Sequence, residues 1–436
     1  MLKLGKAVVL NIKTFTLAPI TKELYRIKPS DFIRHRKLPF ELVALCMLKT
    51  LRMNLALEIE SFMDAFGHLL KRFTPSAFIQ ARQKVKPELF AAISNIVVDT
   101  FYKEVGAACK TYKGHRLLAI DGSTVNLPFT PDLIETYGVY TNTRANGDLI
   151  VARVSMLYDV LNELALEGFL QPFSKSEQVL AKQHFDTCQP GDVVLMDRAY
   201  PSFDSAFTLH QKGVHFIFRC KESYSNQTRW FMASGKREAF VELEPSHSHA
   251  LSDKPYDKQA RLRVRLIHIA LGGGKVELLM TSLLDEQQYP YSDFKGLYCK
   301  RWRIETFYDR FKNLVAVERF SGTSHQFIQQ EFYCALYLAN MQTTLLWDAQ
   351  QEVDEKQKHR QYAYKVDSSV SLGFIRKKLL DIFANEDDVE KSLEDLKQFF
   401  IRNTNAVRPG RTFNRDPDKY RNRTTPKQFT NRRILP

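Results

Sequence analysis

Four polar side chains of different chemistry are spaced along one short stretch: Tyr298, Arg301, Glu305 and Lys312. The stretch holds good helix formers and no Gly or Pro after Gly296, so we predict a helix. At about 100° per residue the four side chains share an arc of roughly 60°, in a stripe about 21 Å long. A guanidinium and an ammonium on such a stripe could hold phosphate groups, while the carboxylate could bind a metal ion. The geometry is equally compatible with a solvated face carrying an i,i+4 ion pair.

Two aspartates upstream would complete a metal site with Glu305. Asp121 follows the apolar run 117–120, and Asp197 follows the apolar run 193–196. Such short runs fit strands buried on both faces, although a strand-end turn residue would have the same setting. Three converging carboxylates need compensating positive charge, and oxygen ligands suit two Mg²⁺ ions, or Mn²⁺ in their place. Asp309, about 40° from Glu305 on the same helix, is a rival third acid.

The segments around these acids alternate in a recognisable order. Strands are predicted at 151–158 and 163–168, a helix at 176–185, a strand at 193–196, a helix at 202–212 and a strand at 214–219. With the strand at 117–120, this is the element order of an α/β ribonuclease H-like core. We therefore expect Asp121 and Asp197 each at the C-terminal end of a buried strand.

The spacing Tyr-x2-Arg-x3-Glu-x6-Lys resembles the signature of the DDE transposases of insertion-sequence family four. The segment 121–123, Asp-Gly-Ser, matches the first acidic motif of that family, and 197–200, Asp-Arg-Ala-Tyr, matches the second. The family more often has Gly where this chain has Ala199. The resemblance implies that Asp121, Asp197 and Glu305 are the catalytic metal ligands. It also implies that Tyr298, Arg301 and Lys312 bind DNA beside them.

The first 112 residues are predicted to be mostly helical. In the helix expected at 74–85, Thr74 can cap, Pro75 takes the first position, and Arg82 and Lys84 lie among polar residues on the outer surface. Arg and Gln on such a face can contact DNA, but a solvated helix looks the same. The resemblance favours a DNA-binding domain here, with Arg82 and Lys84 as contacts.

Residues 222–290 are predicted to be a β-rich insertion within the catalytic domain, and its Arg261, Arg263 and Arg265 could support DNA. Trp230 and Trp302 are possible stacking platforms for an unpaired base, with core packing as the alternative. The six cysteines and the pair His247 and His249 do not indicate a zinc site or a disulfide framework.

The chain of 436 residues carries a net charge of +14, which predicts a polyanionic partner. Membrane-surface binding is the competing cause, but we find no basic amphipathic segment with a lipid-facing stripe. No apolar run reaches the roughly 18 residues that span a bilayer. Residues 404–436 hold nine Lys or Arg against two Asp and are predicted to be an extended arm on the DNA backbone.

These observations predict a cytoplasmic transposase with four parts: a helical DNA-binding domain (1–112), a catalytic domain (113–350), its β insertion (222–290) and a helical C-terminal region with a basic tail (351–436). The expected reaction is metal-dependent cut-and-paste transposition, and the expected partners are the terminal inverted repeats, target DNA and a second copy of the chain. The alternatives are a nuclease on the same fold without strand transfer, and a silent DNA-binding derivative.

Overall fold

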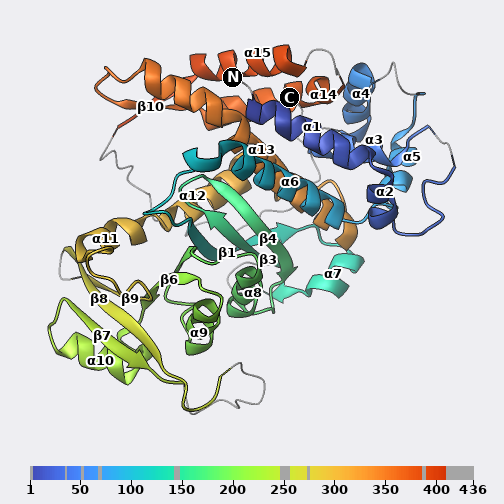
Figure 1. The fold of residues 1–436 in the computed structure, drawn as a ribbon. Coiled ribbons are helices and arrows are strands. Elements are labelled where there is room, and N and C mark those ends of the chain that lie inside the picture. Colours follow the sequence, from blue (N-terminus) through green and yellow to red (C-terminus); the bar gives the residue numbers. More distant parts are fainter. Residues whose placement is uncertain are drawn as a thin grey trace.

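The computed structural model describes residues 3–34, 37–50, 54–66, 71–141, 148–245, 256–272, 275–384 and 389–408. It is a mixed α/β structure in which helices from both ends of the chain cover a large central sheet (Figure 1). None of its described helices is both long and apolar enough to cross a membrane.

The first hundred residues are helical, as predicted. The helices are α1 (Lys3–Leu17), α2 (Pro19–Tyr25), α3 (Phe40–Leu48), α4 (Leu55–Phe66), α5 (Pro75–Arg82) and α6 (Glu88–Val105). In α5, Pro75 is the first residue and the Thr74 side chain accepts a hydrogen bond from the Ala77 amide, so the predicted cap is confirmed. The helix ends at Arg82, three residues earlier than expected.

The central sheet is built from nine strands: β1 (Leu117–Leu127), β2 (Tyr140–Thr141), β3 (Asp148–Asp159), β4 (Leu164–Pro172), β5 (Val193–Met196), β6 (His215–Cys220), β7 (Glu238–Leu243), β8 (Leu262–Gly272) and β9 (Lys275–Thr281). Their order is β2-β3-β1-β5-β6-β9-β8-β7, and β4 also pairs with β3. The β1–β5 and β5–β6 pairs are parallel, whereas the other pairs are antiparallel. All four residues of β5 are buried, which is why its sequence is a continuous apolar run.

Helix α7 (Pro131–Tyr137) lies between β1 and β2. After β4, helices alternate with strands: α8 (Glu177–Gln183), α9 (Phe203–Gln211) and α10 (Asn226–Ala233). The predicted order of three antiparallel strands followed by helix, strand, helix and strand is therefore present. The segment 222–290 also contains α10, which the sequence pattern did not indicate. Its strands β7, β8 and β9 extend the central sheet beyond β6 (Figure 1).

The chain returns to the helical layer through α11 (Tyr291–Cys299), α12 (Trp302–Asp309), a π-helical turn (Arg310–Leu314) and α13 (His325–Lys356). It continues through β10 (Ala363–Val366), α14 (Ser368–Ala384), α15 (Val389–Arg402) and β11 (Thr404–Val407). The long helix α13 packs against α6 and β4, and α1 contacts α13, α14 and α15 (Figure 1). The two ends of the chain thus share one apolar core with the sheet.

Candidate active site

The parallel pairing of β1 and β5 brings the two aspartates together. Its register runs from Leu117 opposite Val193 to Ile120 opposite Met196, and the next residue on each strand is an aspartate. Asp121 and Asp197 therefore lie at the same level along the two paired segments. The sequence suggested that β1 ends at Asp121. The strand instead continues to Leu127, because β3 pairs with it over that length.

Arg301 connects the β1 acid to the helix that carries Glu305. The Arg301 guanidinium donates to Glu305 Oε1 at 2.9 Å and lies 3.4 Å from Asp121 Oδ2. The i,i+4 ion pair is therefore present, but Arg301 is only 2% exposed and does not lie on a solvated face. The Tyr308 hydroxyl donates to the backbone oxygen of Asp121 at 2.7 Å. This bond fixes the Glu305 helix against the Asp121 strand.

Asp197 is held by two further side chains. The Tyr298 hydroxyl donates to Asp197 Oδ1 at 3.4 Å, and the Arg219 guanidinium lies 3.5 Å from the same oxygen. Tyr298 is 1% exposed, so its ring has no open face on which a base could stack. Its hydroxyl orients Asp197 instead, and a contact between Tyr298 and DNA stays a prediction.

The surroundings of Asp121 change the pKa of its carboxyl group. Burial raises the pKa of the Asp121 carboxyl to about 6. Arg301 and the Gly122 amide oppose the rise, whereas Glu305 and Asp197 add to it. This mutual influence places the three acids in one electrostatic cluster. The same cluster leaves Arg301 Nε buried and without a hydrogen-bond partner in the described residues.

The donor chemistry of this cluster fits Mg²⁺ or Mn²⁺, since the three acids offer only oxygen ligands. The geometry is that of a site bridged by an arginine. Within the described ranges, no three acidic, His or Cys side chains are gathered closely enough to share one ion. Arg301 bonds both Asp121 and Glu305, and it would have to release at least one of them to an ion.

The predicted continuous helix is interrupted twice. Helix α11 ends at Cys299, α12 starts at Trp302, and the π-helical turn begins at Arg310, where the Val315 amide bonds the Arg310 oxygen. The stripe geometry of a regular helix therefore does not extend to Lys312, which is half-buried in the π-helical turn. Its contact with DNA stays a prediction.

Asp309, the rival third acid, is exposed and accepts a hydrogen bond from Asn313 Nδ2 at 2.6 Å. Glu305, by contrast, shares Arg301 with Asp121. The geometry favours Glu305.

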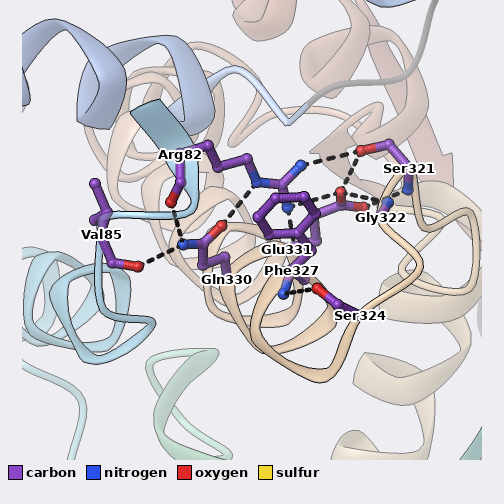
Figure 2. Close-up of polar contacts among 8 residues, drawn as sticks. All are labelled: Arg82, Val85, Ser321, Gly322, Ser324, Phe327, Gln330 and Glu331. Atoms are coloured by element: carbon purple, nitrogen blue, oxygen red, sulfur yellow. Dashed lines mark hydrogen bonds and ion pairs between the residues drawn. The ribbon is translucent and has the colours of Figure 1, made fainter. Parts of the chain in front are cut away.

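Arg82 is not on the outer surface, and that expectation is corrected. Figure 2 shows its guanidinium enclosed by α13 and by the loop before it. Arg82 is 3% exposed and donates to Gln330 Oε1 at 2.7 Å, to the Phe327 oxygen at 3.0 Å and to Glu331 Oε1 at 3.0 Å. It also lies 4.1 Å from the centre of the Phe327 ring. Arg82 alone among the polar side chains of α5 is buried against α13, whereas Gln80 stays exposed, and a sequence window cannot show this difference.

The other predicted DNA contacts lie in different parts of the structure. Lys84 is partly exposed, lies 3.8 Å from Asp31 and lines a cavity of about 1310 Å³ among the N-terminal helices. Trp230 on α10 is 51% exposed, as is Trp302 beside Arg301, so both rings have open surface.

Arg265 is fully buried and bonds Glu238 and the Tyr289 oxygen, so the expectation that it supports DNA is corrected. Arg261 and Arg263 remain exposed. The pair His247 and His249 and most of the basic tail lie outside the described residues, although residues 404–407 form strand β11 rather than an arm.

Sequence reasoning missed three residues that shape the site. Tyr308 contacts Asp121, and Arg219 contacts Asp197. The Tyr200 hydroxyl packs close to Gly122, because a β-carbon added at Gly122 would lie 3.1 Å from it. Arg219 was predictable, because β6 pairs in parallel with β5 and it follows Phe218, the partner of Met196. Tyr308 was also predictable, because it lies three residues after Glu305 and residues three apart on a helix are neighbours on its surface.

Comparisons with known proteins identify the family of the chain. Residues 112–341 match the family model described as the transposase DDE domain. The chain is 24% identical over 323 residues to the transposase InsG of insertion sequence element IS4 from Escherichia coli K12, covering 71% of this chain and 70% of InsG. It is 18% identical over 310 residues to the transposase of IS231E from Bacillus thuringiensis subsp. finitimus, covering 61% and 63% respectively.

Among solved structures, a piggyBac transposase synaptic complex with hairpin DNA aligns over 96% of this chain and 87% of its own, with 12% identity and a TM-score of 0.43.

Proposed function

We propose, for a chain that belongs to the transposase DDE-domain family, that Asp121, Asp197 and Glu305 are the catalytic acids of cut-and-paste DNA transposition. The chain is a transposase of the insertion-sequence type, an enzyme that cleaves DNA and transfers strands. The observation that carries the site assignment is the convergence of the β1, β5 and α12 acids around Arg301. We also propose that the element order of the sheet is a ribonuclease H-like core.

The three acids would hold two Mg²⁺ ions, which supply a Lewis acid and a means of activating water for attack on a phosphodiester. The protein residues around them have separate tasks. Tyr298 and Arg219 orient Asp197, and Tyr308 holds the Asp121 strand against the Glu305 helix. Arg301, once released from one carboxylate, presents two parallel N–H groups to a phosphate of the cleaved strand. Lys312 would bind a second phosphate.

We further propose that the N-terminal helices contact the element ends. The cavity beside α5 is lined by four basic residues and two acidic ones: Arg34, Lys37, Lys71, Lys84, Asp31 and Glu41. This net positive lining suits a DNA backbone. Residues 1–112 would then form the DNA-binding domain, 113–350 the catalytic domain with its insertion 222–290, and 351–436 the C-terminal region. Because an element has two ends, two copies of the chain would act together.

The test uses DNA fragments that end in the inverted repeats flanking the gene. With Mg²⁺, the protein should cut at the repeat ends and join the freed 3′ hydroxyl to a supercoiled plasmid. Cutting without joining would instead show the alternative nuclease. Binding without cutting would show the silent derivative.

Arg301→Lys is expected to lower end cleavage at least about 100-fold, because Lys keeps the charge but loses the planar fork that bonds two oxygens. Arg402→Lys, an exposed residue of α15, is the matched control and should leave cleavage unchanged. Cleavage is measured in single turnover on prebound DNA. If Arg301→Lys cleaves as fast as the parent, Arg301 does not clamp a phosphate.

A further inference from the structure

A cavity lined by basic side chains lies on the opposite side of α12 from Glu305. Its volume is about 260 Å³, and it lies between the β3–β4 turn, α12, α13 and the paired strands β10 and β11. Four basic side chains line it, together with one carboxylate: Lys110, Arg303, Arg310, Lys365 and Glu163. Arg303 and Arg310 project roughly 140–160° away from Glu305 on a helical projection. The cavity is therefore separate from the carboxylate site.

The single carboxylate cannot neutralise this lining. Glu163 Oε1 accepts from Lys365 Nζ at 2.8 Å. Although burial opposes it, Lys365 and the two arginines hold the pKa of Glu163 below its usual range. Glu163 is thus ionised at neutral pH and offsets one of the four positive charges, which leaves the lining at about +3.

Arg310 lines this cavity and has donors without a hydrogen-bond partner in the described part of the chain. Its Nε and one terminal nitrogen are buried and have no hydrogen-bond partner among the described residues. A buried guanidinium without acceptors loses its hydration with no compensation, so such donors are normally satisfied by an ion or by ordered water. Two neighbouring N–H groups of one guanidinium match two oxygens of a single oxyanion.

The other basic side chains of the cavity suit a compact anion. Arg303 already donates to the Val160 oxygen at 2.8 Å, which fixes its guanidinium in place. Lys110 is exposed and lies 5.2 Å from the centre of the Trp347 ring. Lys110 and Lys365 can thus reach the solvent side of an anion whose inner oxygens face Arg310. A volume of about 260 Å³ accommodates a phosphate group with its hydration.

We propose that this cavity binds a phosphate-type oxyanion, with Arg310 donating two hydrogen bonds and Lys110 and Lys365 closing over it. Two sources share this chemistry: a phosphate of bound DNA, and free inorganic phosphate. Only the first source rests on the proposed function, so the two are tested separately.

The free-phosphate arm titrates inorganic phosphate into the full-length protein by calorimetry. If free phosphate is the ligand, Arg310→Gln should weaken its binding at least about 10-fold, because the paired donors are lost. Lys110→Gln, an exposed change that leaves the core intact, should weaken binding about 3-fold or more. Lys391→Gln, an exposed change on α15, controls for net charge and should bind like the parent.

The DNA arm measures the slope of log K against log salt for a repeat-end duplex. If a DNA phosphate is the ligand, Arg310→Gln and Lys110→Gln should each reduce the slope by about 1, whereas Lys391→Gln should not. Weaker phosphate binding or a smaller salt slope in the two variants supports the site. The arm in which the change occurs identifies the source of the anion. The proposal is overturned if the parent binds no phosphate and both variants keep the parental slope, since water then satisfies Arg310. Loss of DNA cleavage alone would bear only on the proposed function.

Discussion

Replacing Arg82 by Met is expected to lower the free energy of unfolding by about 3–5 kcal/mol, the cost of leaving a buried charge without its partner. The change removes every hydrogen bond from the Arg82 guanidinium to α13 and to its preceding loop (Figure 2). Glu331, 9% exposed, would stay buried with only the Ser321 and Gly322 donors. Urea unfolding followed by circular dichroism measures the loss.

The matched control is Lys84→Met, two residues further along. Lys84 is partly exposed and 3.8 Å from Asp31, so its loss should change the free energy of unfolding by less than about 1 kcal/mol. A double-mutant cycle with Glu331→Gln isolates the ion pair, and the double variant should lose less stability than the two single losses together. Unchanged stability in Arg82→Met, with weaker DNA binding, would restore Arg82 to the DNA surface.

The positions of Asp121 and Asp197 were predictable because they depend on local signals. Each follows four apolar residues, and the parallel pairing of those two buried runs places the two aspartates at the same level. Glu305 was preferred to Asp309 because of the family spacing, since helix geometry alone left both open; in the structure one helical turn brings Glu305 to Arg301. Local signals therefore placed the two aspartates, and the resemblance selected the third acid.

The surroundings of these acids were less predictable, because they depend on distant packing. Arg82 meets its partners Gln330 and Glu331 almost 250 residues later in the chain, so its polar neighbours indicated a solvated face. Arg265 pairs with Glu238 across a strand pair whose register no sequence window shows. The break before α12 also left no Gly or Pro as a signal.

Asp121→Asn, Asp197→Asn and Glu305→Gln are each expected to abolish cleavage of repeat-end DNA, a loss of at least about 10³-fold. Each change keeps the size of the side chain and removes one negative oxygen ligand. A metal pair held by three carboxylates loses occupancy or geometry when one of them is neutral, and activation of water is lost with it. Single-turnover cleavage in Mg²⁺ measures the effect.

Asp309→Asn is the matched control, because Asp309 is exposed on the same helix and bonds Asn313 rather than the cluster. It should cleave within about 3-fold of the parent, as expected for a surface change. If Asp309→Asn is inactive and Glu305→Gln is active, the third acid is assigned to the wrong residue. If all four variants cleave, the metal-site proposal fails.

Stability separates the loss of a ligand from the loss of the fold. The pKa of Asp121 rises from its usual 3.8 to about 6 in the folded chain, so the folded state binds this proton more tightly than the unfolded state does. The resulting destabilisation is absent below about pH 4, grows as the pH rises through 6, and is complete above it. Asp121→Asn keeps the oxygen that accepts from the Gly122 amide and removes the buried charge. It should therefore be about 2 kcal/mol more stable than the parent at pH 7.5 and equally stable at pH 4. A variant that is inactive and less stable at pH 7.5 would show that Asp121 supports the fold rather than the chemistry.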